Sequence, residues 1–243
     1  MAGLRDFLRK AEKWDIGEAS QRLTLTKRNP ETSLSAAGAL HGTMRVHLHW
    51  TARASGPAPG SARERWKLLL QPNPFRPVTT PQMGQRPVGV DLDLGCLYEL
   101  SDGTKGVVQP LGPYMGDLQR PPYIRLSHDD RSGAPSGEVM FVDMEHWESF
   151  RRLLFFVYIY DETPAFAETH ATLTLFPTAG PRIEVQLEEH APKARSCAVL
   201  LLERDGSEVT VRREVRYVYG FQAELDRLYG WGLQWQRGYK PVS

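Results

Sequence analysis

The sequence has few cysteines, no long apolar run and no excess charge of one sign. Its 243 residues include two cysteines, too few for the disulfide framework that staples small secreted domains. Its 30 basic and 29 acidic residues leave a formal net charge of +1, so no bulk field recruits nucleic acid or an anionic membrane. No stretch reaches the ~18 apolar residues of a membrane span, and the start lacks the apolar run of a signal peptide. These absences predict a cytoplasmic protein with no nucleic-acid partner and no membrane insertion.

Recognisable catalytic signatures are also absent. The chain contains no G-x-S-x-G, H-E-x-x-H, P-loop or Cys/His arrangement. Cys96 and Cys197 lie in apolar strand-like runs, and neither has a neighbouring His or Lys to lower the pKa of its thiol. Both are therefore predicted to be inert buried thiols. The chain is predicted not to be an enzyme.

Helical periodicity occurs near the two ends, and a short possible helix, Ala62–Leu70, lies between them. Residues 1–19 are predicted to form an amphipathic helix because apolar side chains recur at three- and four-residue spacing: Leu4, Phe7, Leu8, Ala11 and Trp14. Residues 221–229 predict a second short helix, followed by an aromatic tail from Trp231 to Tyr239. Core packing beneath that helix is favoured over a carbohydrate platform or partner surface for these aromatic residues.

Between the ends, apolar and polar residues alternate with the period of β-strands. The alternation starts at Leu23 and Leu25 and continues from Met44 to Trp50. Further strands are predicted near residues 88–100, 105–110, 122–127, 139–143, 153–160, 171–176, 182–188, 196–203 and 207–218. Leu153–Tyr160 is apolar at both parities, which predicts a central strand covered on both faces.

These elements predict an all-β fold. Many strands, few helices and Asp-Gly turns at 102–103 and 205–206 indicate an antiparallel two-sheet β-sandwich with a short N-terminal helix and a short C-terminal helix. A Pro/Gly/Ser-rich stretch at 53–87 is interpreted as an insertion. Residues 20–243 are therefore predicted to be a single β-sandwich domain that this insertion interrupts.

Two acidic segments interrupt the strand pattern. In Val88–Leu100 the even positions are mainly apolar, whereas the odd positions include Asp91 and Asp93, so these two carboxylates share one strand face. Residues 128–138 gather oxygen donors around two glycines: Asp129, Asp130, Ser132, Ser136 and Glu138. Calcium takes about 6–8 oxygen ligands, and glycine-containing loops supply them well. The spacing is not that of an EF-hand, so a solvated acidic loop remains the alternative to a cation site.

A pair of histidines offers a different kind of metal site. His47 and His49 share a strand face, a geometry that suits zinc. No second His/Cys pair lies at a recognisable ligand spacing, and Arg45 shares the same face. A polar strand face is therefore favoured over a zinc site.

The chain resembles the TerA-like branch of the bacterial tellurite-resistance family, whose unit is the TerD-type domain. Four segments carry the resemblance in the family's order: VGVDLDLGCLYELSDGTKGVVQPLG, PPYIRLSHDDRSGAPSGE, RRLLFFVYIYDE and YGWGLQWQRGYK. LTLTKRNPETSLS also resembles the opening of that domain, so the resemblance extends from about Ser20 to Lys240 around the 53–87 insertion. Residues 20–243 are thus identified as a single TerD-like domain.

The resemblance implies a calcium-binding, non-enzymatic stress-response module that acts through ion-ordered loops and partner interaction. It implies that Ca²⁺ is bound by carboxylates of the D-L-D strand and the D-D loop, which are Asp91, Asp93, Asp129, Asp130 and Glu138. The hydroxyl of Ser132, in the same loop, is a further predicted ligand. The expected partners are other tellurite-resistance or stress proteins, with a membrane-linked complex as a family expectation. The loop is shorter than is typical of the family, which leaves the ion count open.

Two other functions stay open at this point. One is a metal-dependent hydrolase or a small-anion-binding protein that uses the same acidic rim. The other is a scaffold that has lost its metal.

Overall fold

The structure, a computed structural model, describes residues 21–51, 92–127, 137–159, 166, 169–189, 191 and 193–235. One sheet has seven strands, in the spatial order β1 (Arg22–Thr24), β11 (Arg182–Gln186), β10 (Thr172–Phe176), β3 (Thr43–His49), β8 (Glu138–Asp143), β7 (Ile124–Leu126) and β6 (Gly116–Asp117). The other has six, in the order β2 (Glu31–Ser33), β13 (Glu208–Val218), β12 (Ser196–Asp205), β9 (Phe150–Ile159), β4 (Leu92–Leu100) and β5 (Lys105–Val108). A 3-10 helix, η1 (Met144–Ser149), and one α-helix, α3 (Gln222–Tyr229), complete the described elements.

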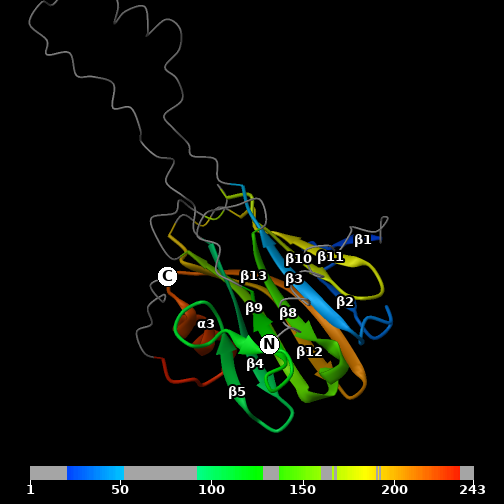
Figure 1. Ribbon diagram of the computed structural model, residues 1–243. Helices are drawn as coiled ribbons and strands as arrows, with labels where there is room; N and C mark the ends of the chain where they lie inside the picture. Colours follow the sequence, from blue (N-terminus) through cyan, green and yellow to red (C-terminus); the bar gives the residue numbers. More distant parts are fainter. Residues whose placement is uncertain are drawn as a thin grey trace, which may run out of the picture.

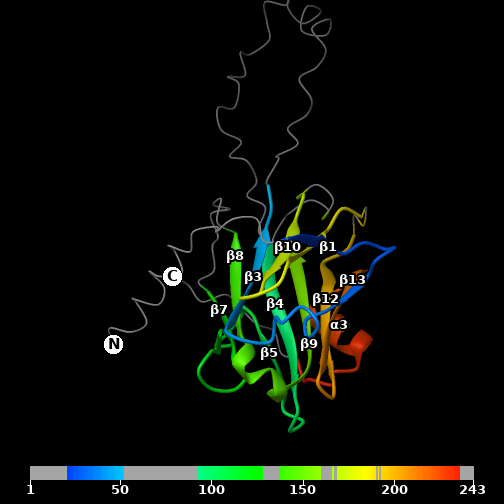
Figure 2. The same ribbon diagram turned by 90° about the vertical axis from the view of Figure 1, so that its right-hand side faces the viewer.

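The two sheets lie face to face around one apolar core (Figures 1 and 2). Side chains from both sheets meet there, for example Val46 and Met140 from one sheet and Leu94 and Phe155 from the other. The predicted two-sheet β-sandwich is therefore confirmed. All described strand pairs are antiparallel except one: β1 runs parallel to β11.

Strand β9 is covered on both faces, as its uninterrupted apolar sequence predicted. Phe155 and Val157 point into the core between the sheets. Phe156 and Tyr158 point the other way, into a second apolar cluster on the outer face of the six-stranded sheet. Because both faces are buried, this strand does not show the alternating pattern of a half-exposed strand.

The C-terminal part of the described chain covers that second cluster. We call residues 219–235 the C-terminal strap; it contains α3 and the segment that returns across the sheet (Figure 1). Leu225 and Trp231 of the strap are buried against the outer face. Gly230 ends α3 in a left-handed conformation, with φ of 64°, as glycine commonly does after a helix. Packing of the tail aromatics on the sheet is therefore confirmed for Trp231.

Several elements follow the predicted boundaries closely and others were missed. The predicted helix at 221–229 corresponds to α3 at Gln222–Tyr229. The two Asp-Gly turns join β4 to β5 and β12 to β13. Three short elements were not predicted: β2, β6 and η1. The predicted helix over 1–19 and the whole insertion at 53–87 lie outside the described residues.

Candidate functional site

The first half of β4 is an open strand edge. Strand β5 pairs only with Cys96–Glu99, so within the described part of the chain residues 92–95 have β9 on one side and no strand on the other. In an antiparallel ladder the backbone groups of alternate residues point to opposite neighbours. Because Cys96 faces β5, the amide of Leu94 also points to that side, beyond the end of β5. A buried amide there needs an acceptor from outside the sheet.

Glu138 supplies this acceptor from the opposite sheet. It is the first residue of β8, where Glu138, Met140 and Val142 alternate inward, and it is 1% exposed. The Leu94 N–H donates to its Oε2 at 2.5 Å, which joins the two sheets at this edge. Gly137, with φ of 64°, precedes it; a Cβ there would lie 2.1 Å from the Leu48 carbonyl oxygen. Glycine therefore permits the close approach that aims Glu138 inward.

Asp93 lies beside this contact, on the outer face of the six-stranded sheet. Leu92, Leu94 and Cys96 belong to the core between the sheets, so Asp93 projects away from that core. Its cross-strand partner on β9 is Tyr158, and both residues are fully buried. Glu138 therefore contacts the β4 backbone at the residue next to Asp93, and the Asp93 side chain leaves on the other face of the sheet.

These two residues are the described part of the predicted ligand set. The other predicted ligands lie outside the described residues: Asp91, Asp129, Asp130 and Ser132. Within the described residues no group of three or more His, Cys, Asp or Glu side chains is placed to hold a metal ion. The full ligand set therefore stays a prediction.

The described pair fits a hard cation in its chemistry. Calcium binds carboxylate and carbonyl oxygens, and both groups here offer carboxylate oxygens from a buried position. A carboxylate removed from water is costly unless cations or hydrogen-bond donors match it. The chemistry of the two buried carboxylates is therefore compatible with a hard cation, and Glu138 also has a structural role through its hydrogen bond from Leu94.

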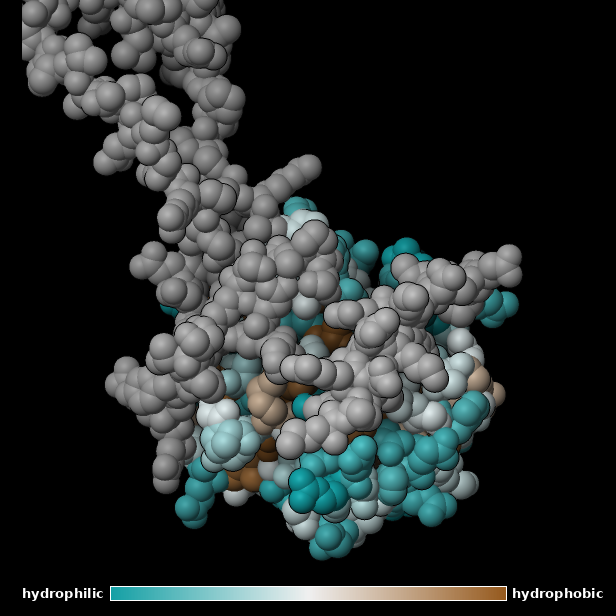
Figure 3. All heavy atoms as spheres, viewed as in Figure 1, coloured by the Kyte–Doolittle hydropathy of each residue, from teal (hydrophilic) through white to brown (hydrophobic). Residues whose placement is uncertain are grey.

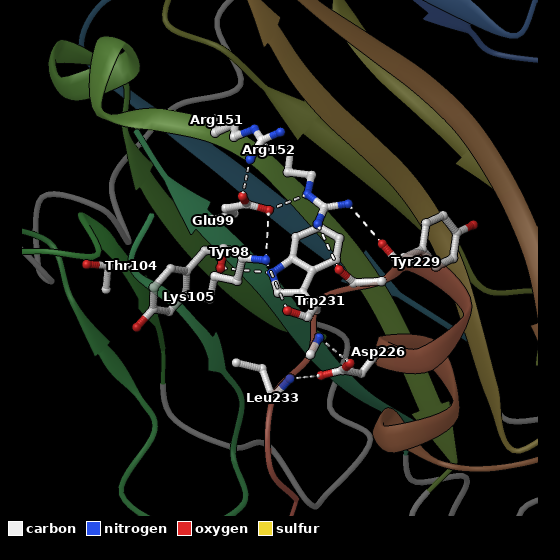
Figure 4. A network of polar contacts seen from close by, with 12 residues as sticks. Tyr98, Glu99, Thr104, Lys105, Arg151, Arg152, Asp226, Tyr229, Trp231 and Leu233 are labelled. Atoms are coloured by element: carbon white, nitrogen blue, oxygen red, sulfur yellow. Dashed lines mark hydrogen bonds and ion pairs between the residues drawn. The ribbon is translucent and has the colours of Figure 1, made fainter. Parts of the chain in front are cut away.

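A second polar cluster, which the sequence did not reveal, surrounds Glu99 at the far end of β4. Its side chain is 2% exposed, and it contacts the guanidinium groups of Arg151 and Arg152 at 2.5 and 2.7 Å and the Lys105 ammonium at 3.6 Å (Figure 4). Glu99 pairs with Arg152 and Leu100 with Phe150, so Arg151 is an extra residue in β9. This β-bulge lets two consecutive arginines reach one carboxylate.

The positive charges around Glu99 affect the pKa of its carboxyl more than burial does. Burial alone would raise the pKa of the Glu99 carboxyl, but the hydrogen bond and charge of Arg152, with the charges of Lys105 and Arg151, lower it below its ordinary value. Glu99 is therefore held as a carboxylate in the folded protein.

Arg152 extends this cluster to the strap. Its guanidinium donates to the carbonyl oxygens of Tyr229 and Gly230 and lies 3.8 Å from the ring centroid of Trp231 (Figure 4). The indole Nε1 of Trp231 donates to the Tyr98 carbonyl oxygen at 2.9 Å. We call Glu99, Arg152 and Trp231 the clasp. It is a structural attachment, since its polar groups bind one another and the strap backbone.

Asp226 joins helix α3 to the residues that follow it in the strap. Its carboxylate accepts from the backbone N–H groups of Gly232 and Leu233 at 2.7 and 2.8 Å (Figure 4). It also accepts from the Nε1 of Trp235 at 2.9 Å. Asp226 is 4% exposed although it lies on a short terminal helix. A single acidic residue in a helical pattern carries no sequence signal for this role, because its partners lie in the segment that follows the helix.

The histidine pair lies on the outer face of the seven-stranded sheet. The ring centroids of His47 and His49 are 6.2 Å apart, and the Arg45 guanidinium lies 4.3 Å from the ring centroid of Phe176 on the neighbouring strand. Figure 3, which looks toward this sheet, shows hydrophilic residues over much of its described part. This arrangement agrees with the predicted polar strand face.

Both cysteines are buried free thiols, as predicted. Cys96 and Cys197 are fully buried and make no disulfide. Burial raises the pKa of both thiols, and at Cys197 the charge of Glu189 adds to the effect while Arg213 opposes it. Neither thiol is therefore a nucleophile or an exposed redox group.

Fold and site together define a class: an all-β protein of two facing sheets, with a buried acidic strand edge and a terminal strap. Comparison of sequences gives a relative. The chain is 34% identical over 221 residues to the tellurium resistance protein TerA of an Alcaligenes species, and the match covers 90% of this chain and 58% of that protein. The chain is therefore a homologue of a tellurium resistance protein, and the resemblance found in its sequence is confirmed. It spans about three-fifths of the length of TerA.

Other comparisons add less. A crystal structure of a homologue of the telluride resistance protein TerD from Streptomyces coelicolor A3(2) matches with a TM-score of 0.46 at 18% identity, covering 75% of this chain and 94% of that chain. The confirmed resemblance rests on the sequence relationship to TerA. No protein-family model matches the chain. Among the described residues, no helix has the length and apolar character needed to cross a membrane.

Proposed function

We propose that this chain is a calcium-binding, non-enzymatic module of the tellurium-resistance type, which acts in the stress response through ion-ordered loops and contacts with partner proteins. The observation that carries the proposal is the burial of Asp93 and Glu138, 0% and 1% exposed, with Glu138 bound to the amide of Leu94, the residue next to Asp93. Such burial is favourable when a cation balances the charge.

The proposed ligand set combines this edge with the acidic segments beside it. Asp93 and Glu138 contribute from β4 and β8, and the remaining oxygen donors are Asp91, Asp129, Asp130 and Ser132. Asp91 is two residues from Asp93, and the loop that contains the other three leads into Gly137 and Glu138. Proximity along the chain to a described carboxylate thus supports each of these assignments.

Calcium at this edge would act by ordering rather than by chemistry. A bound divalent ion lets carboxylates stay together that would otherwise repel, and binding to the folded form stabilises it by mass action. The ordered edge then presents a defined surface, which we propose meets other tellurium-resistance or stress proteins in the cytoplasm. A membrane-linked assembly of such partners belongs to the same proposal.

Calorimetry with calcium tests the proposal directly. We expect Ca²⁺ to bind and, at 100 times its Kd, to stabilise the fold by about 2.7 kcal/mol. Magnesium at the same ionic strength is the control for screening. Equal stabilisation by both ions, or no heat of calcium binding, would contradict the proposed function.

Two isosteric substitutions connect binding to the described edge. Asp93→Asn together with Glu138→Gln keeps size and removes both charges, so calcium affinity is expected to fall at least tenfold. Asp205→Asn is the matched control, because Asp205 is the last residue of β12, at the opposite end of that strand from the row that contains Asp93. Calcium binding that is undiminished in the double variant would refute the assignment of these ligands.

A further inference from the structure

The outer face of the seven-stranded sheet carries a row in which aromatic and arginine side chains alternate. Phe176 of β10 pairs with Arg45 of β3. Arg45 pairs in turn with Phe141 of β8, and Phe141 with Arg125 of β7. The neighbours of these residues along each strand belong to the core between the sheets, so all four side chains point outward. We call these four residues the outer row.

Arg45 has no carboxylate partner among the described residues. Its guanidinium lies 4.3 Å from the ring centroid of Phe176, and its Nε is buried without a hydrogen-bond partner there. Burial lowers the pKa of Arg45. By contrast, Arg22 and Arg182 share the Glu184 carboxylate, at 2.6 and 3.2 Å. A partly desolvated guanidinium is stabilised by an acidic group, and for Arg45 that group has to come from outside the described sheet.

The described chain begins at the edge of the same sheet. Gln21 directly precedes β1, which is the first strand of the seven-stranded sheet and pairs with β11. The strap, with helix α3, packs on the other sheet, so within the described ranges no α-helix lies over the outer row. Residues 1–20 are therefore joined directly to the sheet that carries the outer row.

The apolar stripe predicted for residues 1–19 ends in two carboxylates. Asp15 and Glu18 follow Ala11 by four and seven residues, so in a helix they extend the stripe towards β1. The apolar members of the stripe are Leu4, Phe7, Leu8, Ala11 and Trp14. One face of this predicted helix therefore combines apolar and acidic side chains, which is complementary to the aromatic and basic outer row.

The lengths of chain and sheet also agree. Strand β3 is three strands from β1 in the sheet, a distance of about 14 Å. The seven residues from Asp15 to Arg22 span up to about 23 Å when extended, so the Asp15 carboxylate can reach Arg45. A helix from Leu4 to Trp14 is about 15 Å long, enough to continue over β8 and β7.

We propose that residues 1–19 dock as an amphipathic helix on the outer row, with Asp15 paired to Arg45 and the apolar stripe packed on Phe141 and Phe176. The segment and the sheet face involved take no part in the proposed calcium function. An isolated helix of this length is marginal in water, so burial of its stripe on the sheet supplies the stability that the segment lacks alone.

Hydrogen exchange of the full chain, followed by mass spectrometry, tests the docking. Residues 4–15 are expected to exchange at least about tenfold more slowly than an unstructured chain. Asp15→Arg is expected to speed this exchange about fivefold, the effect of about 1 kcal/mol of lost attraction. Asp6→Arg is the matched control, because Asp6 lies away from the stripe, and it is expected to leave the rate unchanged. Unprotected residues 4–15, or equal effects of the two substitutions, would overturn the proposal.

Exchange of the two charges tests the pairing of Asp15 with Arg45. Arg45→Asp alone is expected to speed exchange as Asp15→Arg does, and the two substitutions together are expected to restore slow exchange. If Arg45→Asp fails to fold, Arg45→Gln and Asp15→Asn replace the reversed pair. Their combined effect is then expected to be no larger than either effect alone, because both remove the same contact. Additive effects would refute the pairing.

Sedimentation under the same conditions identifies the occupant of the outer row. Slow exchange of residues 4–15 in a monomer, at a rate independent of protein concentration, supports docking within one chain. Slow exchange that appears only together with a dimer would assign the outer row to the segment of a second copy and would overturn the proposal.

Discussion

Removal of the Glu99 carboxylate is the sharpest test of how the strap is held. Glu99→Ala leaves the Arg152 guanidinium, whose side chain is 20% exposed, without its carboxylate partner beneath Trp231. Breaking a buried pair by deleting one partner costs roughly 3–5 kcal/mol, because the remaining charge stays desolvated. We expect a loss of that size in the free energy of unfolding, measured by urea denaturation followed by circular dichroism.

The matched control is an ion pair on the same strap. Glu224 and Arg227 are 2.5 Å apart, with side chains 45% and 81% exposed, so Glu224→Ala is expected to cost less than about 1 kcal/mol. The pH dependence of the free energy of unfolding gives a second measure of the Glu99 contribution. Because the folded-state pKa of Glu99 lies below its ordinary value of 4.5, its contribution is complete above that pH and is lost as pH falls through the lower value. Equal losses for Glu99→Ala and Glu224→Ala at pH 7 would refute the reasoning.

Two further predictions concern backbone and thiols. Gly137→Ala is expected to lower the urea midpoint more than Gly206→Ala: both residues have positive φ, 64° and 60°, but only the Gly137 Cβ meets another atom, the Leu48 carbonyl oxygen at 2.1 Å. Equal lowering of the urea midpoint by the two substitutions would show that the contact between the new Cβ at position 137 and the Leu48 carbonyl oxygen is relieved without cost. Cys96 and Cys197 are expected to resist a thiol reagent at pH 8 until guanidinium unfolds the chain, because burial raises the pKa of both thiols and excludes the reagent. Rapid labelling of the folded protein would contradict their burial.

The strand pattern was readable from sequence because each strand packs at least one face on apolar neighbours. Leu153–Tyr160 predicted β9 from its unbroken apolar run, and the predicted span 139–143 differs from β8 by one residue. The missed elements, β2 and β6, have three and two residues, too few to display a period. The parallel pairing of β1 with β11 joins segments far apart in the sequence, and no local pattern specifies it.

The acidic site was only partly readable. Strand parity placed Asp93 on the face opposite Leu92 and Leu94, and the structure agrees. Parity did not indicate that this face is buried, since the strap that packs on its Phe156 and Tyr158 comes more than 120 residues later in the chain than Asp93. Nor did it indicate that Glu138 reaches across to the Leu94 amide, which requires β5 to end before that residue.

The sequence by itself determined the all-β class, most strand positions, the terminal helix and the relationship to TerA, because periodicity and family motifs are local properties of the chain. Only the tertiary structure decided which polar groups meet. The Glu99 clasp depends on a bulge that brings Arg151 and Arg152 to one carboxylate, and on a tail that returns to place Trp231 over Arg152. Buried charges form through such long-range pairings because each needs a partner from another element to offset its desolvation.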